Sequence, residues 1–82
     1  MYFVYVLRNP EGRLYIGFTT DMDERVRRHE AGESGWTHSR GPWRHVYHES
    51  FSDPAAALKR ERVLKNGKAN MELRERFGGS AR

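Results

Sequence analysis

The beginning of the chain has the residue pattern of a β-hairpin. Every position from Tyr2 to Leu7 is apolar, which is typical of a strand that is covered on both faces. Residues 9–12 (Asn-Pro-Glu-Gly) have the composition of a turn, and a second strand-like run extends from Arg13 to Thr19. The pattern therefore predicts a hairpin whose first strand is central in a small sheet sandwiched between helices.

A short helix is predicted directly after the hairpin. Asp21 can cap it, Glu24 completes a capping box, and we expect the helix to run from about Met22 to Ala31. At 100° per residue, the stripe facing the sheet contains Met22, Arg25, Val26 and His29. An arginine on the buried stripe of a helix is unusual, which makes it a candidate functional residue.

The second half of the chain predicts one further strand and two helices. We expect the strand from Trp43 to Phe51, because this stretch carries a weak alternation of apolar side chains. Asp53 followed by Pro54 predicts the start of a helix that stops at Gly67. A short amphipathic helix over residues 68–77 and a frayed tail over residues 78–82 complete the prediction, so residues 1–77 form the single domain.

Glu61 interrupts the apolar stripe of the second predicted helix. Ala57 and Leu58 precede it by four and three residues, and Leu64 follows it by three, so all of them lie on the same face of the helix. An unpaired ionised carboxylate there would cost several kcal/mol, so it requires a cation. The cation could be an arginine, a lysine or a metal ion, so a structural ion pair, with Arg25 as the arginine candidate, and a metal site both remain open.

Composition narrows the function classes. The chain of 82 residues has a formal net charge of +4, and its fifteen basic residues are twelve arginines and three lysines. The planar guanidinium of arginine forms paired hydrogen bonds with phosphate and stacks on bases, so this composition modestly favours a nucleic-acid partner. The absence of cysteine excludes disulfide-stapled mini-proteins, cysteine enzymes and thiolate zinc sites. We expect a cytoplasmic protein without a membrane span, because the longest apolar run is the first strand.

The candidate residues together resemble a known family. From about Tyr2 to Arg74, the chain resembles the GIY-YIG nuclease superfamily, especially its small stand-alone bacterial members. The motif residues are Phe3-Val4-Tyr5, Tyr15-Ile16-Gly17, the Thr19-Thr20-Asp21 helix entry, Arg25, His29 and the Leu58-Lys59-Arg60-Glu61 run. Phe3 and Val4 replace the glycine and isoleucine of the first motif. Ala69-Asn70 stands where many members carry Gly-Arg, so phosphate contacts near Asn70 are left open.

The resemblance implies an α/β (α+β) fold of order β-β-α-β-α-α, with a three-stranded antiparallel sheet flanked by helices. It also implies an endonuclease or nickase that hydrolyses phosphodiester bonds in DNA, such as structured or damaged DNA in repair or recombination. By this resemblance, Tyr5 or Tyr15 would assist the nucleophilic water, and Arg25 would bind a phosphate oxygen. His29 would relay charge, and Glu61 would hold one Mg²⁺ or Mn²⁺ ion. A single carboxylate predicts weak metal binding until substrate phosphate supplies further ligands.

Each of these roles has a structural alternative. Tyr5 and Tyr15 could be core aromatics with their hydroxyls at the rim, and His29 could interact with the helix dipole. Basic side chains that could contact DNA are Arg25, Arg40, Arg44, Lys59, Lys65 and Lys68, although such clusters are usually solvated faces.

The chain as a whole also has alternatives. It could be a catalytically inert nucleic-acid-binding module of the same fold, or a protein-interaction domain with Trp36 and Trp43 as an apolar patch. A partner protein could supply specificity to so small a domain.

Overall fold

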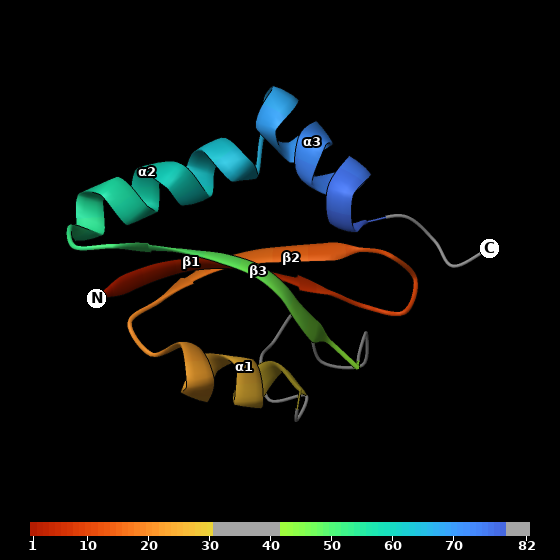
Figure 1. Ribbon diagram of the computed structural model, residues 1–82, viewed down its shortest axis with the longest axis horizontal. Helices are drawn as coiled ribbons and strands as arrows, with labels where there is room; N and C mark the ends of the chain where they lie inside the picture. The colour runs from red at the N-terminus through yellow and green to blue at the C-terminus, as the bar shows by residue number, and fades with distance from the viewer. Residues whose placement is uncertain (31–41, 79–82) are drawn as a thin grey trace.

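The computed structural model describes residues 1–30 and 42–78, except for the side chains of residues 29 and 30. Its elements are β1 (Tyr2–Arg8), β2 (Leu14–Thr19), α1 (Met22–Glu30), β3 (Arg44–Phe51), α2 (Pro54–Leu64) and α3 (Gly67–Phe77), arranged as Figure 1 shows. The predicted α+β class and the order β-β-α-β-α-α are therefore confirmed. No helix in the described ranges is long and apolar enough to cross a membrane.

The sheet is antiparallel and has β1 in its centre. The strand order is β2-β1-β3, and both neighbours pair with β1 in the antiparallel sense. Four consecutive β1 residues, Val4 to Leu7, are fully buried. This explains the unbroken apolar run, because a central strand with helices on both faces has no side that meets water.

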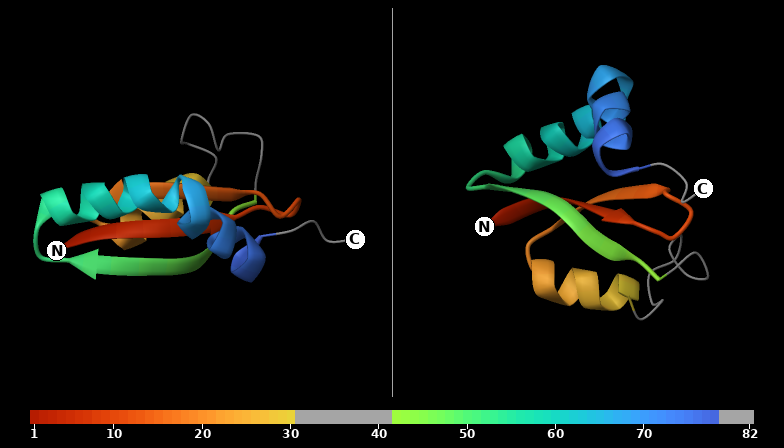
Figure 2. Two further views of the ribbon diagram at one scale, coloured as in Figure 1. Left: turned by 90° about the horizontal axis from the view of Figure 1, so that it is seen from above. Right: turned by 45° about the vertical axis from the view of Figure 1, so that its right-hand side comes forward.

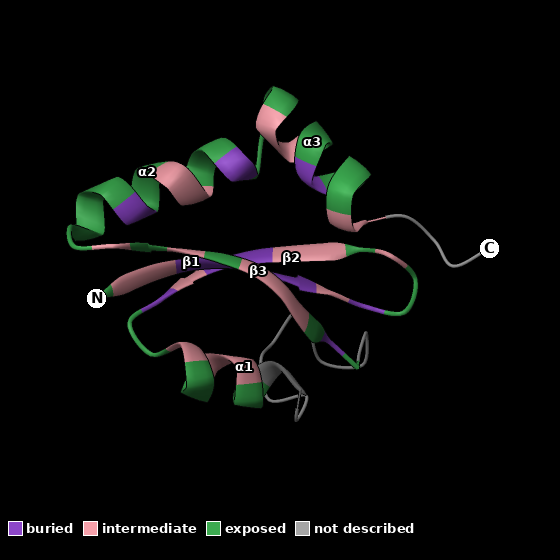
Figure 3. Ribbon diagram, in the orientation of Figure 1, coloured by how far each residue is buried: buried purple, intermediate pink, exposed green. Residues whose placement is uncertain are grey.

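Helices cover both faces of the sheet. In Figures 1 and 2, α1 lies against one face, and α2 and α3 lie against the other. The core is correspondingly divided. On the α2–α3 side it contains Val4, Val6, Ile16, Ala57, Leu64 and Leu73, and on the α1 side it contains Tyr5, Leu7 and Trp43, against which Tyr15, Met22 and Val26 pack. Figure 3 shows the exposed residues of the helices on their outer faces.

Side-chain caps fix the starts of the first two helices. The Asp21 carboxylate accepts the Glu24 backbone N–H at 3.1 Å at the start of α1, as predicted. At α2, the Asp53 carboxylate accepts the Ala56 backbone N–H at 3.0 Å. The prediction for the end of α2 was three residues too long, because the helix ends at Leu64 and a left-handed Gly67 (φ +61°) begins α3.

A β-bulge in β3 explains the weak alternation of that strand. Val6 pairs with Tyr47 but Leu7 pairs with His45, so Val46 is an extra residue opposite β1. Beyond the bulge, alternate side chains change face. His48, which pairs with Tyr5, and His45 therefore lie on the same side of the sheet although they are three residues apart.

Candidate active site

The aromatic ring of Tyr5 lies over Gly17 on the adjacent strand. The two residues are directly opposite in the register of β1 and β2, so their Cα–Cβ directions point to the same face. A Cβ atom built on Gly17 would lie 2.5 Å from Cζ of Tyr5 and closer still to its hydroxyl. The glycine in the Tyr-Ile-Gly motif thus provides the space that the Tyr5 ring occupies, and Tyr5 is fully buried.

Tyr15 is the second aromatic residue on this face. It pairs with Leu7 in the register, and its ring centroid is 6.2 Å from that of Tyr5. On its other side it meets the edge of Trp43 at 6.3 Å. Trp43 is 2% exposed and therefore belongs to the core. It is not available as an apolar contact patch for a partner, whereas Trp36 lies outside the described residues.

Arg25 connects α1 to Tyr5. The pKa of Tyr5 is raised to about 12: burial raises it most and the neighbouring Tyr15 also raises it, whereas the charge of Arg25 and a hydrogen bond with its side chain lower it. The effect of burial is larger than that of the arginine. Tyr5 therefore keeps its proton at neutral pH, and its hydroxyl oxygen accepts the hydrogen bond from the Arg25 guanidinium.

Glu61 lies in the layer on the opposite side of the sheet. Its side chain is 19% exposed, and Oε2 accepts an ion pair from Nζ of Lys65 at 3.2 Å. Within the described residues, the cation at Glu61 is therefore Lys65 and not Arg25. The apolar stripe around it is narrower than predicted, because Ala57 and Leu64 are buried but Leu58 is 45% exposed.

Glu61 acts on Tyr5 although α1 and α2 cover opposite faces of the sheet. Its charge contributes to raising the pKa of Tyr5. A hollow of about 250 Å³ at β2 is lined by Tyr15 and Lys65, together with Leu14, Ile16 and Asn70. The ring of Tyr15, the guanidinium of Arg25 and the carboxylate of Glu61 therefore share Tyr5 as a common neighbour.

The donor set at Glu61 fits a magnesium ion held mainly by water and substrate. In the described part of the chain, no three His, Cys, Asp or Glu side chains come together as a metal site. Mg²⁺ is commonly bound by one or two carboxylates, several waters and phosphate oxygens. The half-buried Glu61 carboxylate matches that mode, with Lys65 as its partner when no ion is bound.

In the described part of the chain, the other predicted basic residues do not line the hollow at Tyr15. His29 belongs to α1, but its side chain, like Arg40, is outside the described residues. Arg44 is exposed at the start of β3, opposite Arg8, and lines a separate hollow with Trp43. Lys59 and Lys68 are exposed on α2 and α3 and do not line the hollow at Tyr15.

The remaining motif residues support the fold. Val4 and Ile16 belong to the core on the α2–α3 side. Phe3 is half-buried, and its ring meets His48 edge-on at 6.1 Å on the α1 side. The substitutions of the first motif therefore leave the position of Tyr5 intact.

Two polar pairs on β3 were not singled out in the sequence. His48 Nδ1 lies 3.0 Å from His45 Nε2, a contact that the β-bulge makes. Glu49 accepts two hydrogen bonds from Arg60 of α2, at 2.9 and 3.0 Å, and a third from the hydroxyl of Tyr47. These bonds lower the pKa of Glu49. No local sequence signal marks either pair, because both depend on tertiary pairing.

Comparison with known proteins places the chain in a family. The GIY-YIG catalytic domain family matches residues 1–74, so the chain belongs to the GIY-YIG family, and the predicted membership is confirmed. Nucleases of this family typically use a divalent metal, and their substrate class is DNA.

Its relatives are UPF0213 proteins of archaea and bacteria. The one from Haloquadratum walsbyi is 41% identical over 66 residues, which cover 79% of this chain and 74% of that protein. The one from Staphylococcus aureus strain Mu50 is 35% identical over 74 residues, covering 89% and 90%. The solution NMR structure of UPF0213 protein BH0048 from Bacillus halodurans is 34% identical, covers 96% of this chain and 88% of that chain, and has a TM-score of 0.56.

Proposed function

We propose that this protein is a metal-dependent endonuclease or nickase that hydrolyses phosphodiester bonds in DNA. One observation carries the proposal. Tyr5 is hydrogen-bonded to Arg25, the charge of Glu61 acts on the same tyrosine, and Tyr15 packs beside it, in a chain of the GIY-YIG family. Phosphodiester hydrolysis needs a positioned water, positive charge at the phosphate and a site for the ion, and these groups supply each of them.

Tyr5 acts as a positioning residue. Its raised pKa keeps the hydroxyl protonated, so it orients the Arg25 guanidinium through their hydrogen bond. Arg25 in turn neutralises charge on a non-bridging phosphate oxygen. This role differs from that of a base, for which a pKa near the operating pH is needed.

Tyr15 and Glu61 face the reacting atoms. Tyr15 lines the hollow at the β2 edge, where its hydroxyl can hydrogen-bond the attacking water. The water oxygen forms a bond to phosphorus and gives up a proton to solvent, the phosphorus–oxygen bond to the leaving group breaks, and the leaving oxygen takes up a proton from solvent, so the step balances. Glu61 would hold the divalent ion, which when bound supplies positive charge to the phosphate. Lys65 would release Glu61 and remain beside the substrate.

A cleavage assay with a matched control tests this proposal. Supercoiled, single-stranded and branched DNA are incubated with Mg²⁺, Mn²⁺ or EDTA and with wild type, Glu61→Gln or Glu72→Gln. Both variants neutralise one glutamate, but Glu72 is exposed on α3, outside the site. We expect metal-dependent cleavage that Glu61→Gln abolishes and Glu72→Gln preserves. Equal cleavage by wild type and Glu61→Gln would refute the metal role of Glu61.

The ion pair between Glu61 and Lys65 also favours a second candidate, an inert nucleic-acid-binding module. In that case Lys65 is the permanent partner of Glu61. Salt-dependent DNA binding without cleavage in any metal would support this candidate over the enzyme. With either candidate, a protein partner that supplies specificity stays a prediction, as does the domain range 1–77 with its tail at 78–82.

A further inference from the structure

Two hollows continue from the candidate active site along the outer side of β2. The hollow of about 250 Å³ at Tyr15 is followed by one of about 650 Å³ between α3 and the β1–β2 turn. Leu14 and Asn70 line both, so the hollows form one groove from Tyr15 to Arg74 and Gly12. We call it the β2–α3 groove. Its volume is in the range of sites that bind small ligands or parts of larger ones.

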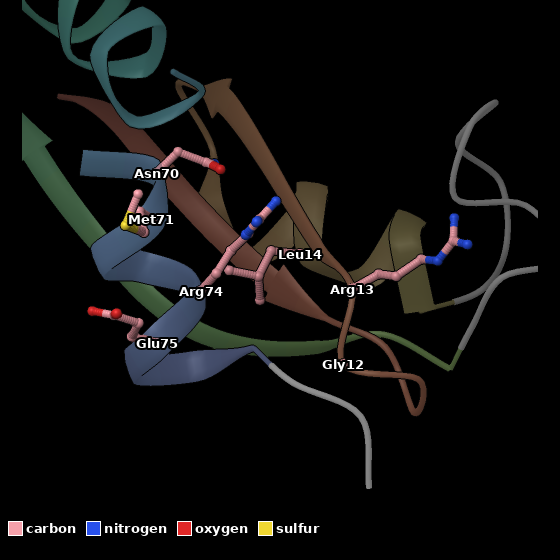
Figure 4. A pocket seen from close by; sticks show the side chains of 7 residues that line it. All are labelled: Gly12, Arg13, Leu14, Asn70, Met71, Arg74 and Glu75. Carbon is pink, nitrogen blue, oxygen red and sulfur yellow. The ribbon is translucent and has the colours of Figure 1, made fainter. Parts of the chain in front are cut away.

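Arg74 is the cation inside this groove. Figure 4 shows its side chain reaching from α3 towards Leu14 on β2, whereas Glu75 points away on the other side of the helix. Arg13 also lines the hollow, but its guanidinium extends away from α3 and lies 3.7 Å from Glu11. Within the described residues, Arg74 takes part in no ion pair. Its guanidinium is therefore available to an anionic ligand.

Asn70 precedes Arg74 by one helical turn, about 6 Å along the helix axis. Its Nδ2 donates to the Leu64 carbonyl at 2.9 Å, at the end of α2. This bond holds the amide in place at the point where the two hollows join. The second amide hydrogen and the Oδ1 atom stay available to a ligand. Asn70 therefore provides a polar contact between the Tyr15 end and the Arg74 end of the groove.

Apolar surface alternates with these polar groups. Met71 lines the groove and is 56% exposed, and Leu14 faces it from β2. Grooves that bind single strands combine cations for the backbone with apolar or aromatic surface for unstacked bases. Double-stranded DNA would offer only its backbone to such a surface.

The geometry points to the β2–α3 groove as the path of a single nucleic-acid strand that continues from the scissile phosphate, with a neighbouring phosphate bound by Arg74. This inference rests on the proposed function, because Tyr15 marks the cleavage end. Arginine suits the role, since its planar fork forms paired hydrogen bonds with phosphate oxygens.

Binding of a fluorescent oligonucleotide of about 12 nucleotides, measured by anisotropy in EDTA at several salt concentrations, tests the inference. The full chain is compared with Arg74→Ala and with Arg76→Ala, which removes the same charge from the same helix. Arg76 is the matched control because it stacks over Phe77 at 5.0 Å and does not line the groove. We expect Arg74→Ala to weaken binding about tenfold. The slope of log affinity against log salt should become shallower by about 0.7.

Arg76→Ala should change the affinity less than about twofold, as for an exposed charge near a ligand. Equal losses of affinity in the two variants would overturn the inference, because they would show only a general effect of charge. Unchanged affinity in Arg74→Ala would also overturn it, as would tighter binding of a duplex than of a single strand. The assay involves no cleavage, so the groove and the catalytic role of Glu61 can fail independently.

Discussion

The contact between Tyr5 and Gly17 predicts that even one methyl group at Gly17 destabilises the fold. Gly17→Ala places a Cβ atom 2.5 Å from Cζ and 3.0 Å from Cε2 of the Tyr5 ring. Carbon atoms pack at about 3.5 to 4.0 Å, so the ring or the strand must move by about 1 Å. Tyr5 is buried among Leu7 and Trp43 and has little room to do so.

Because a buried ring or strand must move by about 1 Å, we expect an overpacking cost in the upper part of the usual range, about 2 to 3 kcal/mol. The alanine also restricts the unfolded chain, which offsets about 0.4 to 1 kcal/mol at most. For a domain of this size, each kcal/mol lowers the unfolding temperature by about 4 to 8 °C. We therefore expect thermal unfolding, followed by circular dichroism, to shift downwards by about 5 to 20 °C.

A second substitution distinguishes the Tyr5 contact from a general effect on β2. Tyr5→Leu removes most of the ring, so the double variant with Gly17→Ala should lose less stability than the sum of the two single variants. Ser50→Thr is the control, because it adds one methyl group at an exposed strand position. Unfolding of Gly17→Ala within about 0.5 kcal/mol of wild type would refute the reasoning.

Three further predictions follow from single residues. The folded state raises the pKa of Tyr5 from about 10 to about 12, so this tyrosine contributes stability below pH 10 that is lost as pH rises from about 10 to 12. Urea unfolding at pH 9 and 11 should show wild type losing about 1.3 kcal/mol more than Tyr5→Phe, and identical pH profiles would contradict the burial effect. The bonds from Arg60 lower the pKa of Glu49, so their contribution is present above the unfolded pKa of about 4.3 and is lost as pH falls through the lower folded value. Glu49→Gln should therefore lower the free energy of unfolding by about 1 kcal/mol at pH 7, a value that already allows for the partial exposure of the ion pair. In strong acid the two proteins should be almost equally stable. A difference that stays constant across pH would exclude the ion pair as its source. Asp53→Ala removes the cap of α2 and should cost about 1 kcal/mol in chemical unfolding, while Asp53→Asn, which can also cap, should restore most of it.

Local sequence signals were sufficient for most of the fold. The apolar run of β1 indicated a central strand, because only a strand with two covered faces has no polar positions. Asp21 and Asp53 marked helix starts correctly, since an N-cap acts within one turn and needs no tertiary contact. The sequence motif contains both Tyr5 and Gly17, but only the register of β1 against β2 shows that the Tyr5 ring lies over the glycine.

Features that depend on distant pairing were not predictable in this way. The bulge at Val46 arises from the register of β3 against β1, and no residue type in the strand marks it. The sequence required a cation at Glu61 but did not choose among an arginine, a lysine and a metal, and the structure places Lys65, one turn along the chain, beside it. The sequence pattern placed Arg25 and Glu61 on helix faces that meet the sheet, but it could not assign the helices to opposite faces.

That separation has a consequence for the proposed chemistry. If Arg25 and Glu61 lay in one layer, they would form an ion pair and neutralise each other at the point where charge is needed. With the sheet between the helices, Arg25 is directed to Tyr5 and Glu61 to Lys65, so the two charges do not pair with each other. In the proposed mechanism, a phosphate would therefore meet the Arg25 guanidinium and an ion held by Glu61 as two separate positive charges. On that proposal, the sheet keeps the guanidinium and the carboxylate apart until the substrate is bound.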